Sequence, residues 1–173
     1  MPGILHAAVG AAAGRAVARV RTGRLMVVLA LLSMLPDLDV LAFAFGIPYQ
    51  APFGHRGALH SIAMALVIGA LCSLDARAWQ LSRLRMFGVV SAVIASHGLL
   101  DTFTDGGLGI ALAWPLSNHR FFFSWRPLPV APIGAGILSR YGLHVLLTES
   151  IVAVPLLVYA FWPRRRSMAG PPR

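Results

Sequence analysis

Long apolar stretches separated by short polar connections make up most of this chain. The stretches cover residues 3–20, 25–35, 40–47, 58–74, 86–103 and 143–162. A helix of about 20 apolar residues spans the ~30 Å hydrocarbon core of a bilayer. We treat the second and third stretches as one segment that Pro36 breaks or kinks. The pattern predicts an all-α, polytopic membrane helical bundle with about five membrane-crossing or membrane-embedded helices.

The composition supports a membrane protein. Apolar residues make up 57% of the chain and charged residues 12%, and the mean hydropathy is +0.72, whereas a soluble domain carries about 25% charged residues. A chain of 173 residues is expected to form one domain. We predict a single integral-membrane helical domain over residues 1–163 and a disordered, basic cytoplasmic tail over residues 164–173. The N-terminus lacks the basic region of a signal peptide, so we expect the first apolar segment to be retained.

The basic residues are all arginines, and their placement predicts an orientation. The net charge is +9. With five crossings, eleven of the fifteen arginines fall on one side of the membrane, and the other side carries Arg56, Arg120, Arg126 and Arg140. Because basic residues are enriched on the cytoplasmic side, we expect the N-terminus outside and the C-terminus in the cytoplasm. Topology accounts for the basic charge, and the sequence shows no basic face or motif for nucleic-acid binding.

His97 and Asp101 are the most informative polar residues within the apolar stretches. They lie four residues apart, on one face of a helix, where ionisable groups are costly in a membrane without partners. At 1.5 Å per residue, the two lie roughly 18–24 Å above the cytoplasmic end of their stretch. The same count places further ionisable residues in the outer half of the bilayer, namely His6, Asp37, His60 and Glu149. We therefore expect several helices to share one polar site.

The residue types at this depth indicate a metal site. A single buried histidine more often makes a helix–helix hydrogen bond, but a set of histidines and aspartates offsets its burial cost by sharing a cation. The chain has one cysteine, Cys72, so imidazole and carboxylate groups must supply the ligands. This donor set suits zinc, and also manganese or iron. We expect one or two divalent cations, most simply zinc, held by His6, Asp37, His60, His97 and Asp101.

Four motifs carry a resemblance to a known family. They are L-P-D-L-D at residues 35–39, G-H-R-G-A-L-H-S at 54–61, S-H-G-L-L-D-T-F-T at 96–104, and a later W-P-L-S…R-F-F-F…P-L-P stretch. With these motifs, residues 4–150 or so resemble the YdjM-type family of bacterial inner-membrane proteins. That family is described as membrane-bound, metal-dependent hydrolases. The resemblance implies a metal-dependent hydrolase in the bacterial inner membrane.

A more distant similarity connects the His-x-x-x-Asp helix to zinc-dependent phospholipase C and P1 nuclease. That similarity implies that Asp101 bridges two zinc ions and that His97 is a terminal ligand. It implies further ligands at His60, Asp37 and His6. The chain lacks the extra C-terminal histidine ligands of that group, so a third metal is not expected.

The chemistry expected of such a site is hydrolysis. A divalent cation lowers the pKa of a water molecule towards neutrality, which prepares the water to attack an ester or phosphoester. Asp39 or Glu149 is expected to act as the base. Arg56 is expected to take part in catalysis, because a guanidinium suits bidentate binding of phosphate.

The other polar residues on the outer side keep more than one interpretation. His55 is a metal ligand, a residue that orients a ligand, or a residue at the start of a helix. Arg120 and Arg126 either bind substrate or anchor the protein at the membrane interface. His119 and His144 are expected to be structural.

The function favoured by these features is membrane-embedded, metal-dependent hydrolysis of a phosphoester bond in a lipid or membrane-proximal substrate. The active site is expected towards the periplasmic side, with the lipid bilayer and a phospholipid or other phosphorylated amphiphile as partners. Two alternatives remain: a metal-binding structural or regulatory membrane protein, and a divalent-metal transporter. Transport is disfavoured because the inner halves of the stretches are apolar and offer a cation no path.

Overall fold

The computed structural model describes residues 3–18 and 22–163 of the chain. Its regular secondary structure is helical, and two isolated bridges join Thr104 to Leu128 and Ile110 to Phe121. The elements in chain order are α1 (Ile4–Val17), α2 (Thr22–Met34), the 3₁₀ helix η1 (Leu35–Phe45), η2 (Ala58–His60), α3 (Ile62–Ser73), η3 (Ala76–Trp79), α4 (Arg83–Asp101), η4 (Gly134–Leu138) and α5 (Arg140–Phe161). The predicted all-α fold class is confirmed.

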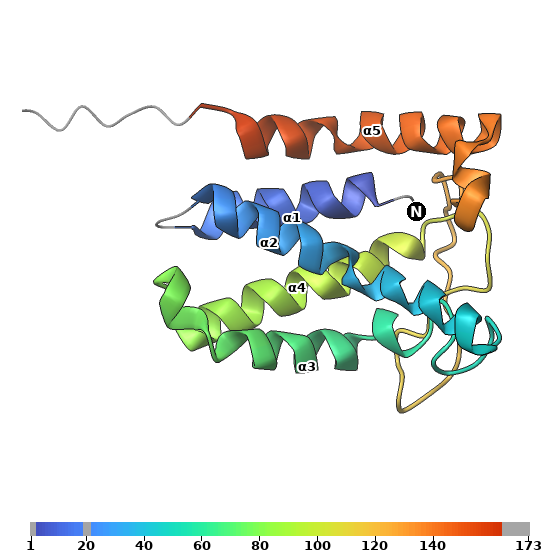
Figure 1. Ribbon diagram of the computed structural model, residues 1–173, viewed down its shortest axis with the longest axis horizontal. Coiled ribbons are helices and arrows are strands. Elements are labelled where there is room, and N and C mark those ends of the chain that lie inside the picture. The colour runs from blue at the N-terminus through green and yellow to red at the C-terminus, as the bar shows by residue number, and fades with distance from the viewer. Residues whose placement is uncertain (1–2, 19–21, 164–173) are drawn as a thin grey trace, which may run out of the picture.

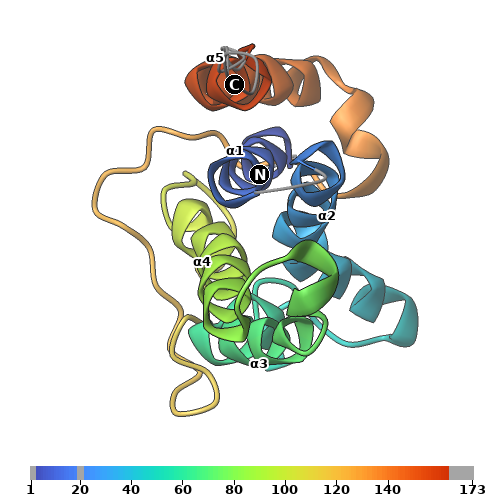
Figure 2. The ribbon, with the colours of Figure 1, turned by 90° about the vertical axis from the view of Figure 1, so that its left-hand side faces the viewer.

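The α-helices run side by side along the long axis of the molecule (Figure 1). Seen along that axis, α1 lies between α5 on one side and α2 and α4 on the other, and α3 packs against α4 (Figure 2). The connection between α3 and α4, which contains η3, lies at one end of the bundle. The helices η1 and η2 and the long connection from α4 to α5 gather at the opposite end. That end carries the polar motifs of the sequence.

Within the described residues, three helical segments are long and apolar enough to cross a membrane: Thr22–Phe45, Arg83–Asp101 and Arg140–Phe161. The two shorter apolar helices are Ile4–Val17 and Ile62–Ser73. The polytopic membrane bundle predicted from the apolar stretches is therefore confirmed, with three helical segments of spanning length and two shorter helices.

Pro36 lies at the change from α2 to the 3₁₀ helix η1, where the sequence predicts a break. Proline has no N–H to donate and disfavours α-helix at the preceding residue. With three residues per turn in a 3₁₀ helix, Asp37 and Asp39 point in different directions. The Asp39 side chain is 2% exposed and the Asp37 side chain 28%. The break thereby delivers two carboxylates with different surroundings to the polar end of the bundle.

Two glycines allow close approach between neighbouring helical segments. A Cβ at Gly10 on α1 would lie 2.2 Å from the carbonyl oxygen of Leu29 on α2. A Cβ at Gly98 on α4 would lie 2.4 Å from the carbonyl oxygen of His60. A side chain at either position would push the two backbones apart, because the interior is already close-packed. The contact at Gly98 places η2 directly against α4.

Some sequence predictions fall outside the described residues. They concern the basic tail at residues 164–173, and Arg19 and Arg21, two of the eleven arginines that the sequence places on the cytoplasmic side. The division of the chain into one domain over residues 1–163 remains a prediction.

Candidate metal centre

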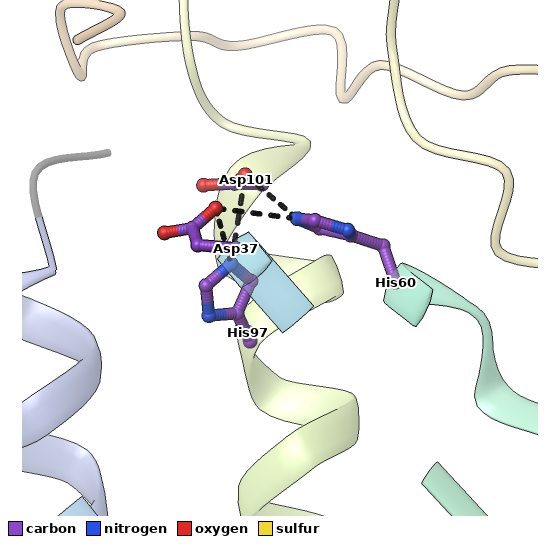
Figure 3. Close-up of side chains that lie close together, drawn as sticks. All are labelled: Asp37, His60, His97 and Asp101. Atoms are coloured by element: carbon purple, nitrogen blue, oxygen red, sulfur yellow. Dashed lines mark ion pairs between the residues drawn. The ribbon is translucent and has the colours of Figure 1, made fainter. Parts of the chain in front are cut away.

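Four side chains from three elements converge at the polar end of the bundle. Asp37 comes from η1, His60 from η2, and His97 and Asp101 from α4. One nitrogen or oxygen atom from each lies within 4.8 Å of the corresponding atom of every other. Figure 3 shows the four side chains pointing toward one another. These four were all predicted as metal ligands, and the structure brings them together.

The distances inside this cluster suit coordination of one cation. The Nε2 atom of His97 lies 3.3 Å from Asp37 Oδ1 and 3.9 Å from Asp101 Oδ2. The Nε2 atom of His60 lies 3.6 Å and 3.7 Å from the same two oxygens. In a tetrahedral site with bonds of 2.0–2.1 Å, neighbouring ligand atoms lie about 3.3 Å apart. Two imidazole nitrogens and two carboxylate oxygens therefore surround a point at close to ligand spacing.

Both histidines present a buried nitrogen that lacks a hydrogen-bond partner within the described part of the chain. His97 donates from Nδ1 to the carbonyl oxygen of Ser33 at 2.7 Å, which leaves the lone pair of Nε2 directed at the cluster. His60 is 1% exposed and His97 0%. Neither Nε2 atom has a hydrogen-bond partner among the described residues. A buried polar atom without a partner is costly, and a bound cation removes that cost. The residues present therefore fit a divalent metal.

Asp39 contacts the Nδ1 atoms of His60 and His55. Its Oδ2 lies 3.0 Å from His60 Nδ1 and accepts a hydrogen bond from the backbone N–H of Arg56 at 2.8 Å. Its Oδ1 lies 2.5 Å from Nδ1 of His55. A carboxylate on the far nitrogen of a ligating histidine fixes the ring orientation and raises its basicity. Asp39 is thus placed to orient His60, and its contact with His55 favours an orienting role for that histidine.

His6 lies beside the cluster. Its Nε2 is 3.4 Å from Asp101 Oδ1, the oxygen that faces away from His60 and His97. Its ring stacks on that of His97, with the centroids 3.6 Å apart and the planes at 14°. His6 therefore contacts the remaining oxygen of Asp101 and is not among the four grouped residues. Its predicted role as a ligand stays a prediction.

Ser33 on α2 was not singled out from the sequence, although it connects His97 of α4 to His6 of α1. Its carbonyl oxygen accepts from His97, and its hydroxyl lies 2.7 Å from the carbonyl oxygen of His6. The sequence offered one indication of this role: Ser33 precedes Asp37 by four residues, about one helical turn, so the two are expected on the same face of a helix.

Arg56 carries an unusual backbone and a buried charge. Its φ is 61°, in the left-handed region that few residues other than glycine adopt. The side chain is 2% exposed, and Nε lies 3.4 Å from Asp101 Oδ2. One terminal nitrogen donates to Thr104 Oγ1 at 3.0 Å and to the carbonyl oxygen of Gly106 at 2.9 Å. Strained backbone of this kind is concentrated at functional sites, and here it places a guanidinium beside the cluster.

A cavity of about 540 Å³ opens next to the cluster. Its polar lining residues are Asp37, Tyr49, His55 and Arg56, and its lining also includes residues 130–134 and Ile137. Burial raises the pKa of the Tyr49 phenol above its ordinary value, so its hydroxyl stays protonated and can donate. The volume lies within the ~300–1,000 Å³ range of small-molecule sites.

Arg120 is tied to the backbone near the cavity. Its guanidinium donates to the carbonyl oxygens of His55 at 3.0 Å, Tyr49 at 3.1 Å and Arg56 at 3.3 Å. Two further carbonyl oxygens, those of Ala51 and Gly109, lie within 3.4 Å. These bonds fasten the connection between η1 and η2 to the connection that follows α4. Arg120 is therefore placed to stabilise the cavity rim.

Three other predicted residues lie apart from the cluster. Arg126, His119 and His144 all have exposed side chains. The guanidinium of Arg126 lies 4.8 Å from the ring centroid of Phe122, a cation–π contact. The structure brings none of the three to the four grouped residues.

Glu149 is buried and is not one of the four grouped residues; it lies at the first turn of α1. It is 0% exposed, and its Oε2 accepts from the backbone N–H of Ile4 at 3.2 Å. The residue before α1 is Gly3, which has no side chain to cap the helix. Glu149 on α5 thus supplies the acceptor that the first turn of α1 lacks.

Substitutions of Glu149 separate a capping role from the predicted role as a base. We expect Glu149→Gln to keep the metal and any hydrolysis near wild-type levels, because the amide oxygen still accepts from Ile4. We expect Glu149→Leu to lower the free energy of unfolding by about 1–3 kcal/mol, since it leaves a buried N–H unpaired. Thermal unfolding in detergent and metal analysis measure both. A Glu149→Gln protein with full metal and no activity would instead support the base.

Comparison with known proteins agrees with the motifs. The sequence profile described as "YdjM inner membrane protein" matches residues 1–168. The chain is 40% identical over 172 residues to inner membrane protein YbcI of Escherichia coli (strain K12). The aligned region covers 94% of this chain and 98% of that protein. No solved structure matches significantly. The more distant similarity to phospholipase C and P1 nuclease is not confirmed by these matches.

Proposed function

This chain belongs to the YdjM family of inner membrane proteins, and from that premise we propose that it is a membrane-embedded, metal-dependent hydrolase that cleaves a phosphoester bond of a lipid or membrane-proximal substrate. The observation that carries the proposal is the pair of buried Nε2 atoms, on His60 and His97, that face Asp37 and Asp101. Neither of these two nitrogens has a hydrogen-bond partner among the described residues. A cavity of ligand size borders the same cluster through Asp37.

The cluster supplies the charge and donors that a divalent cation needs. Asp37 and Asp101 provide two carboxylate groups, and His60 and His97 provide two imidazole nitrogens. A cation held by them would act as a Lewis acid and lower the pKa of a water molecule. The carbonyl oxygen of Ser33 contacts Nδ1 of His97, and the carboxylate of Asp39 contacts Nδ1 of His60. Such contacts orient an imidazole ring so that its other nitrogen can bind a metal.

The substrate class follows from the groups that line the cavity. Arg56 presents a guanidinium, which binds phosphate oxygens well, and Tyr49 presents a protonated hydroxyl. Asp39 and Glu149, the predicted bases, are not among the residues that line the cavity, and each contacts another group. Asp37 and His55 line it and can accept a proton. We assign proton transfer to one of these two groups.

We also propose that the site faces the periplasm and that the C-terminus is cytoplasmic. The end of the bundle opposite the site carries a group of described arginines: Arg15, Arg24, Arg77, Arg83 and Arg85. Basic residues are enriched on the cytoplasmic side of membrane proteins. This placement supports a periplasmic active site.

A structural role for the metal is the second candidate, because the cluster joins η1, η2 and α4 and is largely buried. In that case the cation would stabilise the bundle without chemistry. The two functions predict different effects of chelation: a hydrolase loses its activity, whereas a protein with a structural metal loses stability and has no activity to lose.

The test uses purified full-length protein in detergent. We expect at least one zinc, manganese or iron ion per chain by elemental analysis, and hydrolysis of a phospholipid or of bis(4-nitrophenyl) phosphate. Chelation is expected to abolish hydrolysis, and added metal to restore it. A folded protein that purifies without metal would refute the metal centre. A metal-loaded protein that hydrolyses neither substrate, and whose melting temperature falls on chelation, would support the structural role.

A further inference from the structure

The cavity beside the metal centre has two chemically different sides. Its polar side faces the cluster and includes Arg56 and Tyr49. The other side chains of its lining are hydrocarbon, and they are those of Val40, Val130, Ala131, Pro132, Ile133 and Ile137. We call residues 130–137 the apolar wall. A pocket with one charged side and one apolar side complements an amphiphile more closely than a free phosphate ion.

The apolar wall is held in place at both of its ends. At its start, the backbone N–H of Val130 donates to Asp105 Oδ1 at 2.7 Å, and Leu128 accepts from the N–H of Asp105 at 2.9 Å. At its end, Ser139 caps α5 by accepting from the N–H of Gly142 at 3.0 Å. The side chains in between are half-buried or exposed: Ile133, for example, is 50% exposed. The apolar wall is therefore held by hydrogen bonds at both ends, and its side chains remain partly exposed.

The apolar wall and the polar side meet at Gly106. The carbonyl oxygen of Gly106 accepts from Arg56 at 2.9 Å. A Cβ on Gly106 would lie 2.7 Å from Cγ1 of Val130, so the backbone here packs directly on the wall. A ligand whose phosphate contacts Arg56 thus has apolar surface beside it, within the same cavity.

We infer that the apolar wall binds a hydrocarbon chain of the substrate, so that this segment selects among phosphorylated amphiphiles by their chains. The inference rests on the proposed function for the headgroup end. The occupant follows from complementarity: phosphate charge opposite Arg56, and hydrocarbon opposite residues 130–137. In this arrangement the hydrocarbon chain of the lipid leaves the bilayer and lies on the apolar wall, and the phosphoester lies beside Asp37.

The first test fills the wall. Ala131→Phe places a ring in the cavity, and Leu138→Phe is the matched control, because Leu138 is 88% exposed and does not line the cavity. We expect Ala131→Phe to lower kcat/KM for a dipalmitoyl phospholipid by about 10-fold or more. The same variant should change hydrolysis of bis(4-nitrophenyl) phosphate, which has no alkyl chain, by less than about 3-fold and should keep its metal. Leu138→Phe should match wild type on both substrates.

A second variant covers the case in which Ala131→Phe does not fold. Ile137→Ala removes wall contacts instead of adding bulk, and we expect the same selective loss on the long-chain lipid. Equal effects on both substrates, or no effect on either, would overturn the inference.

A binding measurement separates this inference from the proposed function. Wild-type protein is irradiated with a phospholipid that carries a diazirine in its acyl chain, and the crosslinked peptides are mapped by mass spectrometry. We expect crosslinks within residues 130–137, reduced in Ala131→Phe. Crosslinks confined to the lipid-facing side of α5 would overturn the chain site. Absence of hydrolysis on every substrate, with crosslinks still on the wall, would overturn the proposed function alone.

Discussion

Asp101→Asn is expected to remove the metal from the purified protein and to abolish hydrolysis. Asp101 is 0% exposed, and its Oδ2 lies 3.4 Å from Nε of Arg56 and within 3.9 Å of the Nε2 atoms of His60 and His97. An amide lacks the negative charge and presents N–H donors where an oxygen stood. Loss of a residue that only orients a ligand typically costs about 10–100-fold in metal affinity. Loss of the central carboxylate should exceed about 100-fold, measured by competition with a chelator.

The same substitution tests stability, because Asp101 also balances the buried charge of Arg56. Leaving that guanidinium without its counter-charge costs about 3–5 kcal/mol, so Asp101→Asn is expected to melt at a lower temperature. His97→Asn isolates the metal effect: its amide nitrogen can replace Nδ1 and donate to Ser33, while Nε2 is lost. His144→Asn is the control, since His144 is exposed on α5. Full metal content in His97→Asn would refute the proposed ligand set.

The helices follow directly from the apolar stretches, because the bilayer requires continuous apolar surface and internal hydrogen bonding. The predicted break at Pro36 is also a local property. What the pattern does not contain is the 3₁₀ geometry of Leu35–Phe45 and of Ala58–His60. Those short helices depend on close contacts between segments, such as His60 against Gly98, which no hydrophobic period encodes.

Counting residues along the helices placed Asp37, His60, His97 and Asp101 at similar depth in the bilayer, and the structure brings these four together. The same count placed Glu149 at that depth as well. A residue count gives height along an axis and says nothing about the side of the bundle that a residue faces. Helix α5 packs against α1, so Glu149 meets the first turn of α1 instead of Asp37. Arg120 illustrates a second limit, because its hydrogen bonds to backbone carbonyls depend on loop conformation. From the sequence, substrate binding and anchoring at the membrane interface both remained open for Arg120.

Arg56→Lys is expected to lower kcat/KM for phosphoester hydrolysis by about 10²–10³-fold, the usual cost of removing a preorganised donor that stabilises developing charge. The guanidinium contacts Asp101 through Nε while a terminal nitrogen donates to Thr104 and Gly106, which fixes its plane against the cavity. A single ammonium cannot hold all of these positions at once. Lysine is the informative replacement, because it keeps the charge and has the same unbranched Cβ in the left-handed backbone.

The outcome distinguishes two roles for Arg56. If Arg56 only neutralises Asp101, lysine preserves that charge, and both metal content and hydrolysis should stay at wild-type levels. If Arg56 positions phosphate oxygens, metal content should stay while hydrolysis falls, and Arg56→Met should in addition lose stability through the unbalanced carboxylate. Arg126→Lys is the control, since that exposed guanidinium lies over Phe122 and does not line the cavity. Because the strained φ of 61° is common to the wild type and the lysine variant, a selective loss of hydrolysis reports on the guanidinium itself.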